Sequence, residues 1–300
     1  MDIGKKIKTI RTEKLMTQKE LAGDEITRNM LSQIENGLAQ PSLSTITYLA
    51  TRLGVPTGYL LSEGEEEFVY YKTRVMRNIK KAYADRNYEL CREMCYSSFE
   101  EFDDELELIL TDCCVGAAEE NIREGKLRLG RELLDESIRH SKKTLYSTVT
   151  QRNRAFLMFN LLQEISPSLD SDEIDTAISP DLMHPSLFGD VFCKYITVIF
   201  GDKYTETEEL LFNNTEELSD YDKLFTAHIR SRQYMNAGDY KKASSILQSI
   251  VDGKTVPQRL LLYICCGDME KCCKELGDYK GAYEFSINKM EILEHMLAEA

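Results

Sequence analysis

The 300-residue sequence has no tryptophan, only six prolines and four histidines, and no run of about 18 apolar residues. The last of these absences excludes a transmembrane helix, and the first ten residues, MDIGKKIKTI, lack the apolar core of a signal peptide. The hydrophobic fraction of 42%, without low-complexity runs, is typical of a folded, soluble chain. We therefore expect a cytoplasmic protein.

Catalytic motifs are also missing. The sequence has neither a glycine-rich phosphate loop nor a nucleophile motif. Its four histidines lack the spacing of metal ligands: His140, His184, His228 and His295. We therefore expect neither enzyme activity nor a cofactor.

Nine cysteines are present, and six of them form adjacent pairs: Cys113-Cys114, Cys265-Cys266 and Cys272-Cys273. Adjacent residues of a helix point about 100° apart, so these pairs are poor disulfide candidates. Cys91 and Cys95 share a helix face, as do members of the last two pairs, which makes a zinc site an alternative. Because no C-x-x-C spacing or nearby His pair occurs, we interpret the cysteines as small core residues and expect no metal.

Charge is distributed unevenly along the chain. The net charge is −14, which argues against a nucleic-acid partner. Residues 1–62, however, contain eight Lys and Arg against six Asp and Glu, a net charge of +2. The remaining residues carry −16 and begin with the acidic run EGEEE at 63–67. A slightly basic head joined to an acidic body indicates two parts with separate roles.

Residues 3–61 have the pattern of five short helices. TQKE at 17–20 is a capping box that opens the second helix. Thr27 is placed as the N-cap of the third helix, and Gly37 is placed to end it in a left-handed conformation. The fourth helix is expected between Ser42 and Gly54, and the fifth follows Pro56 and ends near Leu61.

The third of these helices, residues 27–36, divides into two faces at about 100° per residue. Thr27, Met30, Leu31 and Ile34 form one face, and the other is a polar strip without Asp or Glu: Arg28, Asn29, Ser32, Gln33 and Asn36. Such a strip suits the DNA major groove, because Arg donates two bonds to guanine and Asn or Gln pairs with adenine. The alternative is a helical hairpin inside a bundle, with this face in water.

The segment LMTQKELA…ITRNMLSQIENGLAQPSLSTITYLATRLGVPTGYLL resembles the XRE (Cro/CI-type) helix-turn-helix family over roughly residues 3–62. It contains TQ-x-x-LA, S-x-IENG, P-S-L-x-T and LA-x-x-LGV in order. The resemblance implies base reading by the third helix and a structural Arg11–Glu35 ion pair. It also implies contacts with the DNA backbone by Gln18 of the second helix and by Asn36 and the loop after it. The candidate DNA contacts are Gln18, Thr27, Arg28, Asn29, Ser32, Gln33 and Asn36.

Beyond Phe68 the pattern is almost continuously helical and is punctuated by similar turn-like phrases. These are ADRNYELC (84–91), REGKLRLG (123–130), FGDKYTET (200–207), AGDYKKAS (237–244) and LGDYKGAY (276–283). Their marker residues are Tyr88, Leu127, Tyr204, Tyr240 and Tyr279, separated by 39, 77, 36 and 39 residues. The 77-residue gap indicates a further unit near Ser166–Leu169. This period predicts about six stacked helix pairs, an α-solenoid.

The last two phrases resemble tetratricopeptide repeats, because Tyr240 and Tyr279 are each followed three residues later by an alanine, Ala243 or Ala282. The earlier units match loosely. The resemblance implies a concave surface lined by the first helix of each pair. Five side chains are expected to face into it and contact an effector: His228, Arg232, Asn236, Lys271 and Lys274. A solvated surface is the alternative for each of them.

A helix-turn-helix head on a tetratricopeptide-like body resembles the Rgg/PlcR-type transcription regulators. The resemblance implies that the chain binds double-stranded DNA, forms a homodimer and senses a short signalling peptide, without a membrane partner. We predict an all-α chain with a DNA-binding domain at 1–62, an acidic linker at 63–67 and a sensor and dimerisation solenoid at 68–300. The alternative is a protein-interaction scaffold in which DNA binding is secondary.

Dimerisation also has a physical argument. One small module with three or four base contacts has limited specificity, whereas two modules that read half-sites about 34 Å apart square the discrimination. The final segment, residues 288–300, carries apolar residues at helical spacing. It is expected either to cap the stack or to join a partner subunit.

Overall fold

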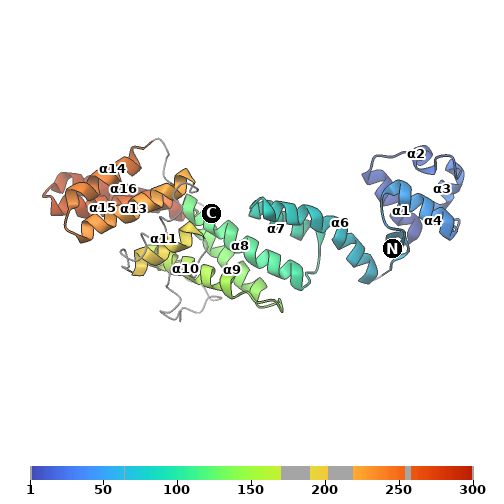
Figure 1. Ribbon diagram of the computed structural model, residues 1–300, viewed down its shortest axis with the longest axis horizontal. Coiled ribbons are helices and arrows are strands. Elements are labelled where there is room, and N and C mark those ends of the chain that lie inside the picture. Colours follow the sequence, from blue (N-terminus) through green and yellow to red (C-terminus); the bar gives the residue numbers. More distant parts are fainter. Residues whose placement is uncertain (1, 64, 170–189, 202–218, 254–257, 299–300) are drawn as a thin grey trace. The chain divides into compact units, whose positions relative to one another are not determined.

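Helices account for all regular secondary structure in the described part of the computed structural model (Figure 1). The structure describes residues 2–63, 65–169, 190–201, 219–253 and 258–298. The chain divides into two compact units, Met1–Lys81 and Ala82–Ala300, and each has its own hydrophobic core. The predicted all-α fold is confirmed.

The first unit consists of five short helices and most of a longer one. They are α1 (Ile3–Glu13), α2 (Gln18–Ala22), α3 (Arg28–Glu35), α4 (Leu43–Leu53), α5 (Thr57–Leu61) and α6 (Glu65–Ala84). Each of the first five contributes apolar side chains to one core, in which Ile7, Leu21, Leu31 and Leu49 are all 0% exposed. The apolar faces predicted from sequence therefore meet in a single small core.

The ends of these helices lie where the sequence predicts them. Thr17 and Glu20 form the reciprocal capping box of α2, and the Thr27 hydroxyl accepts a bond from the Met30 amide at 3.1 Å. Gly37, which follows the C-cap residue of α3, has a φ of +71°, and Gly54 has a φ of +64° directly after α4. Only glycine adopts these angles without strain, so the helix stops are local properties of the sequence.

Lys6 is a core residue of this unit. Its side chain is 0% exposed, and its ammonium group donates to the carbonyl oxygens of Tyr59, at 3.2 Å, and of Ser62. Both carbonyls lie at the end of α5, where a helix leaves acceptors without intrahelical donors. Lys6 therefore joins α1 to the end of α5.

Helix α6 begins at Glu65, inside the segment 63–67 that was expected to be a linker, and continues to Ala84. The division between the two units falls within this helix, after Lys81. The boundaries at 62 and 68 therefore stay a prediction about domains.

The second unit is built from helices that pack against their neighbours in the chain. They are α7 (Tyr88–Ser98), α8 (Asp104–Glu124), α9 (Leu127–Ser141), α10 (Val149–Ile165), α11 (Val191–Gly201), α13 (Asp220–Asn236), α14 (Tyr240–Val251), α15 (Arg259–Glu275) and α16 (Tyr279–Ala298). Four marker residues, Tyr88, Leu127, Tyr240 and Tyr279, are the first residues of α7, α9, α14 and α16. The predicted helix pairs are confirmed at these four places.

Two of the predicted repeat units extend beyond the residues that the structure describes. Ser166–Leu169 forms a turn after α10, and the unit expected to follow it lies outside the described residues. The marker Tyr204 also lies outside them. Ala243 and Ala282, expected at close helix contacts, are 0% and 3% exposed.

The stack of pairs closes on itself, because α15 contacts α8 and α16 contacts α9. Gly125 connects α8 to α9, and a Cβ on it would lie 2.8 Å from Met296 and 2.9 Å from Arg259. Arg123 of α8 donates to Gln258 at 2.9 Å, just before α15 begins. An open solenoid has contacts only between adjacent repeats, so this second unit is a more tightly wound stack.

The C-terminal helix α16 packs with one face on this stack. Met296 is 0% exposed, and Ile292 and Leu297 are partly buried against the core. These contacts favour the interpretation of the C-terminal segment as a cap of the stack. Within the described residues, none of the helices is both long enough and apolar enough to cross a membrane.

Candidate functional site

Helix α3 presents its polar strip to solvent. Arg28, Asn29, Gln33 and Asn36 are exposed, and Ser32 is half-buried. On the opposite face, Leu31 and Ile34 are 0% and 1% exposed and belong to the core of the unit. The predicted division of this helix into a packed face and an open polar face is confirmed.

Two of the candidate contacts have structural roles in the helix itself. Thr27 caps α3 through its hydroxyl, as described above, and Asn36 donates from Nδ2 to the Ser32 carbonyl oxygen at 2.8 Å. Arg28, Asn29 and Gln33 extend from the body of the helix. The reading positions expected from the sequence thus lie together on one exposed surface.

A buried charge network fixes α3 to the two helices before it. Arg11 of α1 donates from Nε and Nη2 to the Glu35 carboxylate, at 2.6 and 3.1 Å, and Gln18 of α2 donates from Nε2 at 2.8 Å. The predicted Arg11–Glu35 ion pair is confirmed. A carboxamide has two N–H donors, so Gln18 can bond to Glu35 and still direct a donor outward.

Helix α4 supports α2 from the other side. Tyr48 donates to the Ala22 carbonyl oxygen at 2.9 Å, and Arg52 donates to the Glu20 carbonyl oxygen at 2.5 Å. These bonds satisfy carbonyls at the end of α2. The surface formed by α2 and α3 is therefore held by contacts with α1 and α4.

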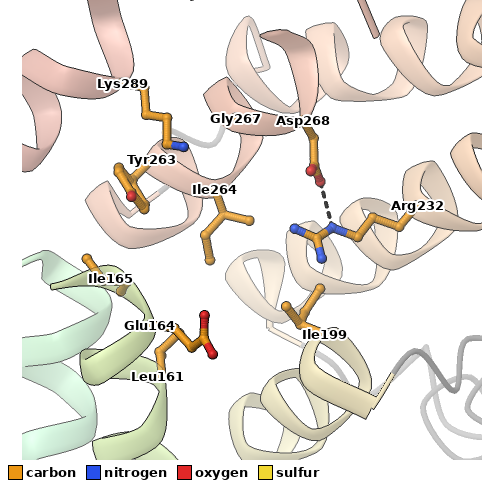
Figure 2. A pocket seen from close by; sticks show the side chains of 10 residues that line it. All are labelled: Leu161, Glu164, Ile165, Ile199, Arg232, Tyr263, Ile264, Gly267, Asp268 and Lys289. Carbon is orange, nitrogen blue, oxygen red and sulfur yellow. Dashed lines mark hydrogen bonds and ion pairs between the residues drawn. The ribbon is translucent and has the colours of Figure 1, made fainter. Parts of the chain in front are cut away.

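The second unit contains a cavity of about 280 Å³ between its helices (Figure 2). Nine lining residues belong to α10, α11, α13 and α15, and Lys289 belongs to α16: Leu161, Glu164, Ile165, Ile199, Arg232, Tyr263, Ile264, Gly267, Asp268 and Lys289. Figure 2 shows the Arg232–Asp268 ion pair on one side of this cavity and Lys289 beside Tyr263 on another. The cavity thus combines aliphatic walls with groups of both charges.

One of the five predicted ligand contacts lines this cavity. Arg232 lines the cavity, and its Nε donates to Asp268 at 2.7 Å. Asn236, Lys271 and Lys274 are exposed and do not line the cavity, and Lys274 pairs with Glu270 at 2.6 Å. The repeat pattern places all five residues on the first helices of their pairs. It does not determine where the surface of these helices forms a cavity.

His228 differs from its expected position, because its side chain is fully buried instead of facing a concave surface. Its Nδ1 lies 3.0 Å from the Tyr195 hydroxyl, and its Nε2 lies 2.8 Å from the Asp268 carboxylate. Burial lowers the pKa of His228. Burial also opposes ionisation of Asp268, but its bonds from His228 and Arg232 outweigh this and lower the pKa of its carboxyl group. His228 therefore supports the Arg232–Asp268 pair from inside the core.

Glu164, Asp268 and Lys289 are lining residues that the sequence did not indicate. The repeat marks the helix starts, whereas these side chains lie near the middle or the end of long helices. Their convergence depends on how α10, α15 and α16 pack, which no short motif specifies.

The first unit defines a helix-turn-helix domain, and residues 7–60 match the family described as "Helix-turn-helix". The chain is 34% identical over 85 residues to a curated relative, the immunity repressor protein of Bacillus phage phi105. The match covers 27% of this chain and 59% of the relative, so it spans less than two thirds of that protein. The predicted helix-turn-helix head is confirmed.

Solved structures that align with nearly the whole chain include two bacterial proteins. The apo form of the competence regulator ComR from Streptococcus vestibularis is 19% identical, with 97% of each chain covered and a TM-score of 0.27. Bacillus thuringiensis PlcR, in complex with the peptide PapR7 and DNA, is 14% identical, with 98% of this chain and 95% of that chain covered and a TM-score of 0.24.

Proposed function

We propose that this chain is a sequence-specific DNA-binding regulator of transcription, in which α3 enters the major groove. The observation that carries the proposal is the open, acid-free polar strip of α3, held in place by the Arg11–Glu35–Gln18 network. A helix-turn-helix domain places the start of its recognition helix against base edges. A rigidly mounted strip of hydrogen-bonding groups suits this task, because base recognition requires donors and acceptors at fixed positions.

Arg28, Asn29 and Gln33 are the proposed base-reading residues. Arg28 suits guanine and the two amides suit adenine, with about 1–3 kcal/mol of discrimination for each well-formed pair. Ser32 lies between them as a base or backbone contact, and Gln18, Thr27 and Asn36 are assigned to the backbone of the DNA. Phosphate contacts fix the register of the protein and carry no direct sequence information.

A homodimer is the proposed assembly, since two linked domains read two half-sites. Support comes from the outer face of α16, where four large apolar residues are exposed: Tyr279, Tyr283, Ile287 and Met290. At about 100° per residue they lie within about 80° of one another, and they form one continuous stripe. An exposed stripe of this kind is typical of a protein–protein contact. We assign it to a second copy of the chain.

The cavity of the second unit is the proposed effector site, and a short peptide is the proposed effector. Arg232 and Lys289 offer donors for carboxylate or carbonyl oxygens, and Glu164 offers an acceptor for amino groups, between apolar walls. An effector that binds one packing of these helices more tightly than another would change the affinity for DNA by about 1–3 kcal/mol.

The proposed location is the cytoplasm, which suits nine cysteines that are all free and buried.

Selection of fragments from random duplex DNA, with the full-length chain as bait, tests this function. A common motif repeated about 34 Å apart, or at a multiple of that distance, is the expected result. Enrichment of no sequence above the input would contradict the proposal. The scaffold alternative is tested by pull-down: a stoichiometric protein partner retained equally by an Arg28→Ala/Gln33→Ala variant would favour it.

A further inference from the structure

A mixed group of side chains converges between α8 and α9, and none of its residues belongs to either site described above. Cys114 of α8 and Glu136 and His140 of α9 each direct a ligand atom into one spot, with these atoms all within 4.8 Å of one another. Cys114 is 0% exposed and His140 is 5% exposed. Thiolate sulfur, imidazole nitrogen and carboxylate oxygen are the three protein ligand types of zinc.

Helical spacing explains why these residues meet. Glu136 and His140 are four residues apart and share a face of α9, and Glu107 and Cys114 are seven residues apart on α8. Helices α8 and α9 pack along their lengths as one pair, so the two faces oppose each other. The sequence predicted no metal because these residues do not form a short motif.

The orientation of His140 is already that of a metal ligand. Its Nδ1 lies 2.5 Å from the buried carboxylate of Glu107, whereas its Nε2 lies 3.8 Å from Oε1 of Glu136. In metal-binding histidines, the N–H group of the second ring nitrogen commonly donates a hydrogen bond to a carboxylate, which fixes the tautomer and the orientation of the ring. Ligand atoms around a tetrahedral zinc ion are about 3.3 Å apart, so Nε2 and Oε1 need to move together only slightly.

Nε2 of His140 and Oε1 of Glu136 are both bonded to the hydroxyl of Tyr96, which an ion would displace. Arg92 of α7 binds Oε2 of Glu136, at 2.7 Å, and not Oε1. The Tyr96 hydroxyl bridges Nε2 and Oε1, at 2.7 and 2.5 Å, and so marks the place where the ion would lie. Tyr96 is 44% exposed, so its side chain can turn outward and leave the fourth position to water.

The charges of the group also suit a divalent ion. Zinc would lie between the Cys114 thiolate and the Glu136 carboxylate, with Arg92 and Glu107 behind them, and these charges cancel. A second group, Glu119, Asp190 and Cys193, has similar ligand types. There the guanidinium of Arg154 lies 2.8 Å from Glu119 and 3.5 Å from Asp190, so both carboxylates already face one cation. Among the residues of the proposed group, by contrast, Arg92 forms an ion pair with Glu136 alone.

We propose that Cys114, Glu136 and His140 form a zinc site that ties α8 to α9, with water in the fourth position and Glu107 as the positioning residue of His140. The site goes beyond DNA binding and does not depend on it. Binding displaces the thiol proton of Cys114 to solvent as the sulfur–zinc bond forms, and no electron transfer occurs.

Equilibrium dialysis of the full-length chain against micromolar zinc, with metal and protein measured in the same sample, tests the site. One zinc per wild-type chain is expected, and Cys114→Ser and His140→Ala should each lower the affinity by at least tenfold. Glu107→Gln should lower it by about 10–100-fold. Cys265→Ser is the matched control, because it makes the same change at another fully buried cysteine and should leave the affinity unchanged.

Cobalt provides a spectroscopic measurement of the same site. Cobalt bound by the wild-type chain should show a thiolate-to-metal charge-transfer band that zinc abolishes and that Cys265→Ser retains. Absence of this band in the folded wild-type chain would overturn the proposal. Equal zinc affinity of the wild type, Cys114→Ser and His140→Ala would also overturn it.

Discussion

Arg11 and Glu35 form a bidentate ion pair, in which Nε and Nη2 donate to the two carboxylate oxygens at 2.6 and 3.1 Å. The Glu35 side chain is 1% exposed and that of Arg11 is 11% exposed. Arg11 also donates from Nη1 to the Met16 carbonyl oxygen at 2.8 Å. One guanidinium thereby joins α1, the turn before α2 and the end of α3, and it holds α3 against α1.

Replacement of Arg11 by alanine should lower the free energy of unfolding of the first unit by about 3 kcal/mol, because it leaves the Glu35 carboxylate buried without its cation. Hydrogen exchange of the α1 and α3 amides in the full-length chain measures this change. Arg74→Ala is the matched control: its pair with Glu13 is exposed and should contribute at most about 1 kcal/mol. Equal exchange rates in the two variants would contradict the structural role of the buried pair.

The proposed reading face predicts different effects for two positions on DNA affinity. Arg28→Ala should weaken the selected site by about 1–3 kcal/mol and affect unrelated duplexes much less, because a base contact is lost. Gln18→Ala should weaken all duplexes more evenly, because a backbone contact is lost. Titration of labelled duplexes at one fixed salt concentration separates the two patterns.

Arg77→Ala provides the control for charge, since Arg77 is an exposed arginine of the same unit on α6. Its removal should leave the preference for the selected site unchanged. If Arg28→Ala has the same site preference as Arg77→Ala, then α3 does not read bases through this residue.

Local features of this chain could be predicted from its sequence, and features that depend on packing could not. Caps and stops at Thr27, Gly37 and Gly54 depend on a few neighbouring residues, and they lie where predicted. Lys6 would be expected at the surface, but its ammonium group donates to carbonyl oxygens at the end of α5, more than fifty residues later in the chain. The repeat pattern likewise predicts His228 at a concave surface, but its burial depends on Tyr195 and Asp268, which lie on other helices.

Burial of His228 predicts that the second unit loses stability in mild acid. A neutral imidazole satisfies both partners, since Nε2–H donates to Asp268 and Nδ1 accepts from Tyr195. The folded-state pKa is lowered below 6.5, so the unfolded chain takes up a proton that the folded chain excludes. The contribution is therefore complete above about pH 6.5 and falls below it, by at most about 1.4 kcal/mol per pH unit.

Urea unfolding of the second unit between pH 7.5 and about pH 4.5 measures this loss, with the range set by the ordinary pKa of histidine. His228→Gln should reduce the slope, because glutamine does not titrate. Asp268 contributes little to the change in this range, since its pKa is lowered and its own loss develops mainly below its ordinary pKa of 3.8. His295→Gln, at an exposed histidine, should retain the wild-type slope.

The apolar stripe on α16 predicts a charge-sensitive dimer. Tyr283 lies within the stripe and is 68% exposed, so Tyr283→Asp should not disturb the core but should place a charge in the proposed interface. We expect the variant to be a folded monomer whose affinity for a two-half-site duplex falls at least tenfold, while its affinity for a single half-site is unchanged. Sedimentation analysis and DNA titration measure the two effects.

Tyr146→Asp is the control, because Tyr146 is 55% exposed but lies between α9 and α10 and outside the stripe. A Tyr283→Asp variant that remains dimeric would place the contact between copies on another surface.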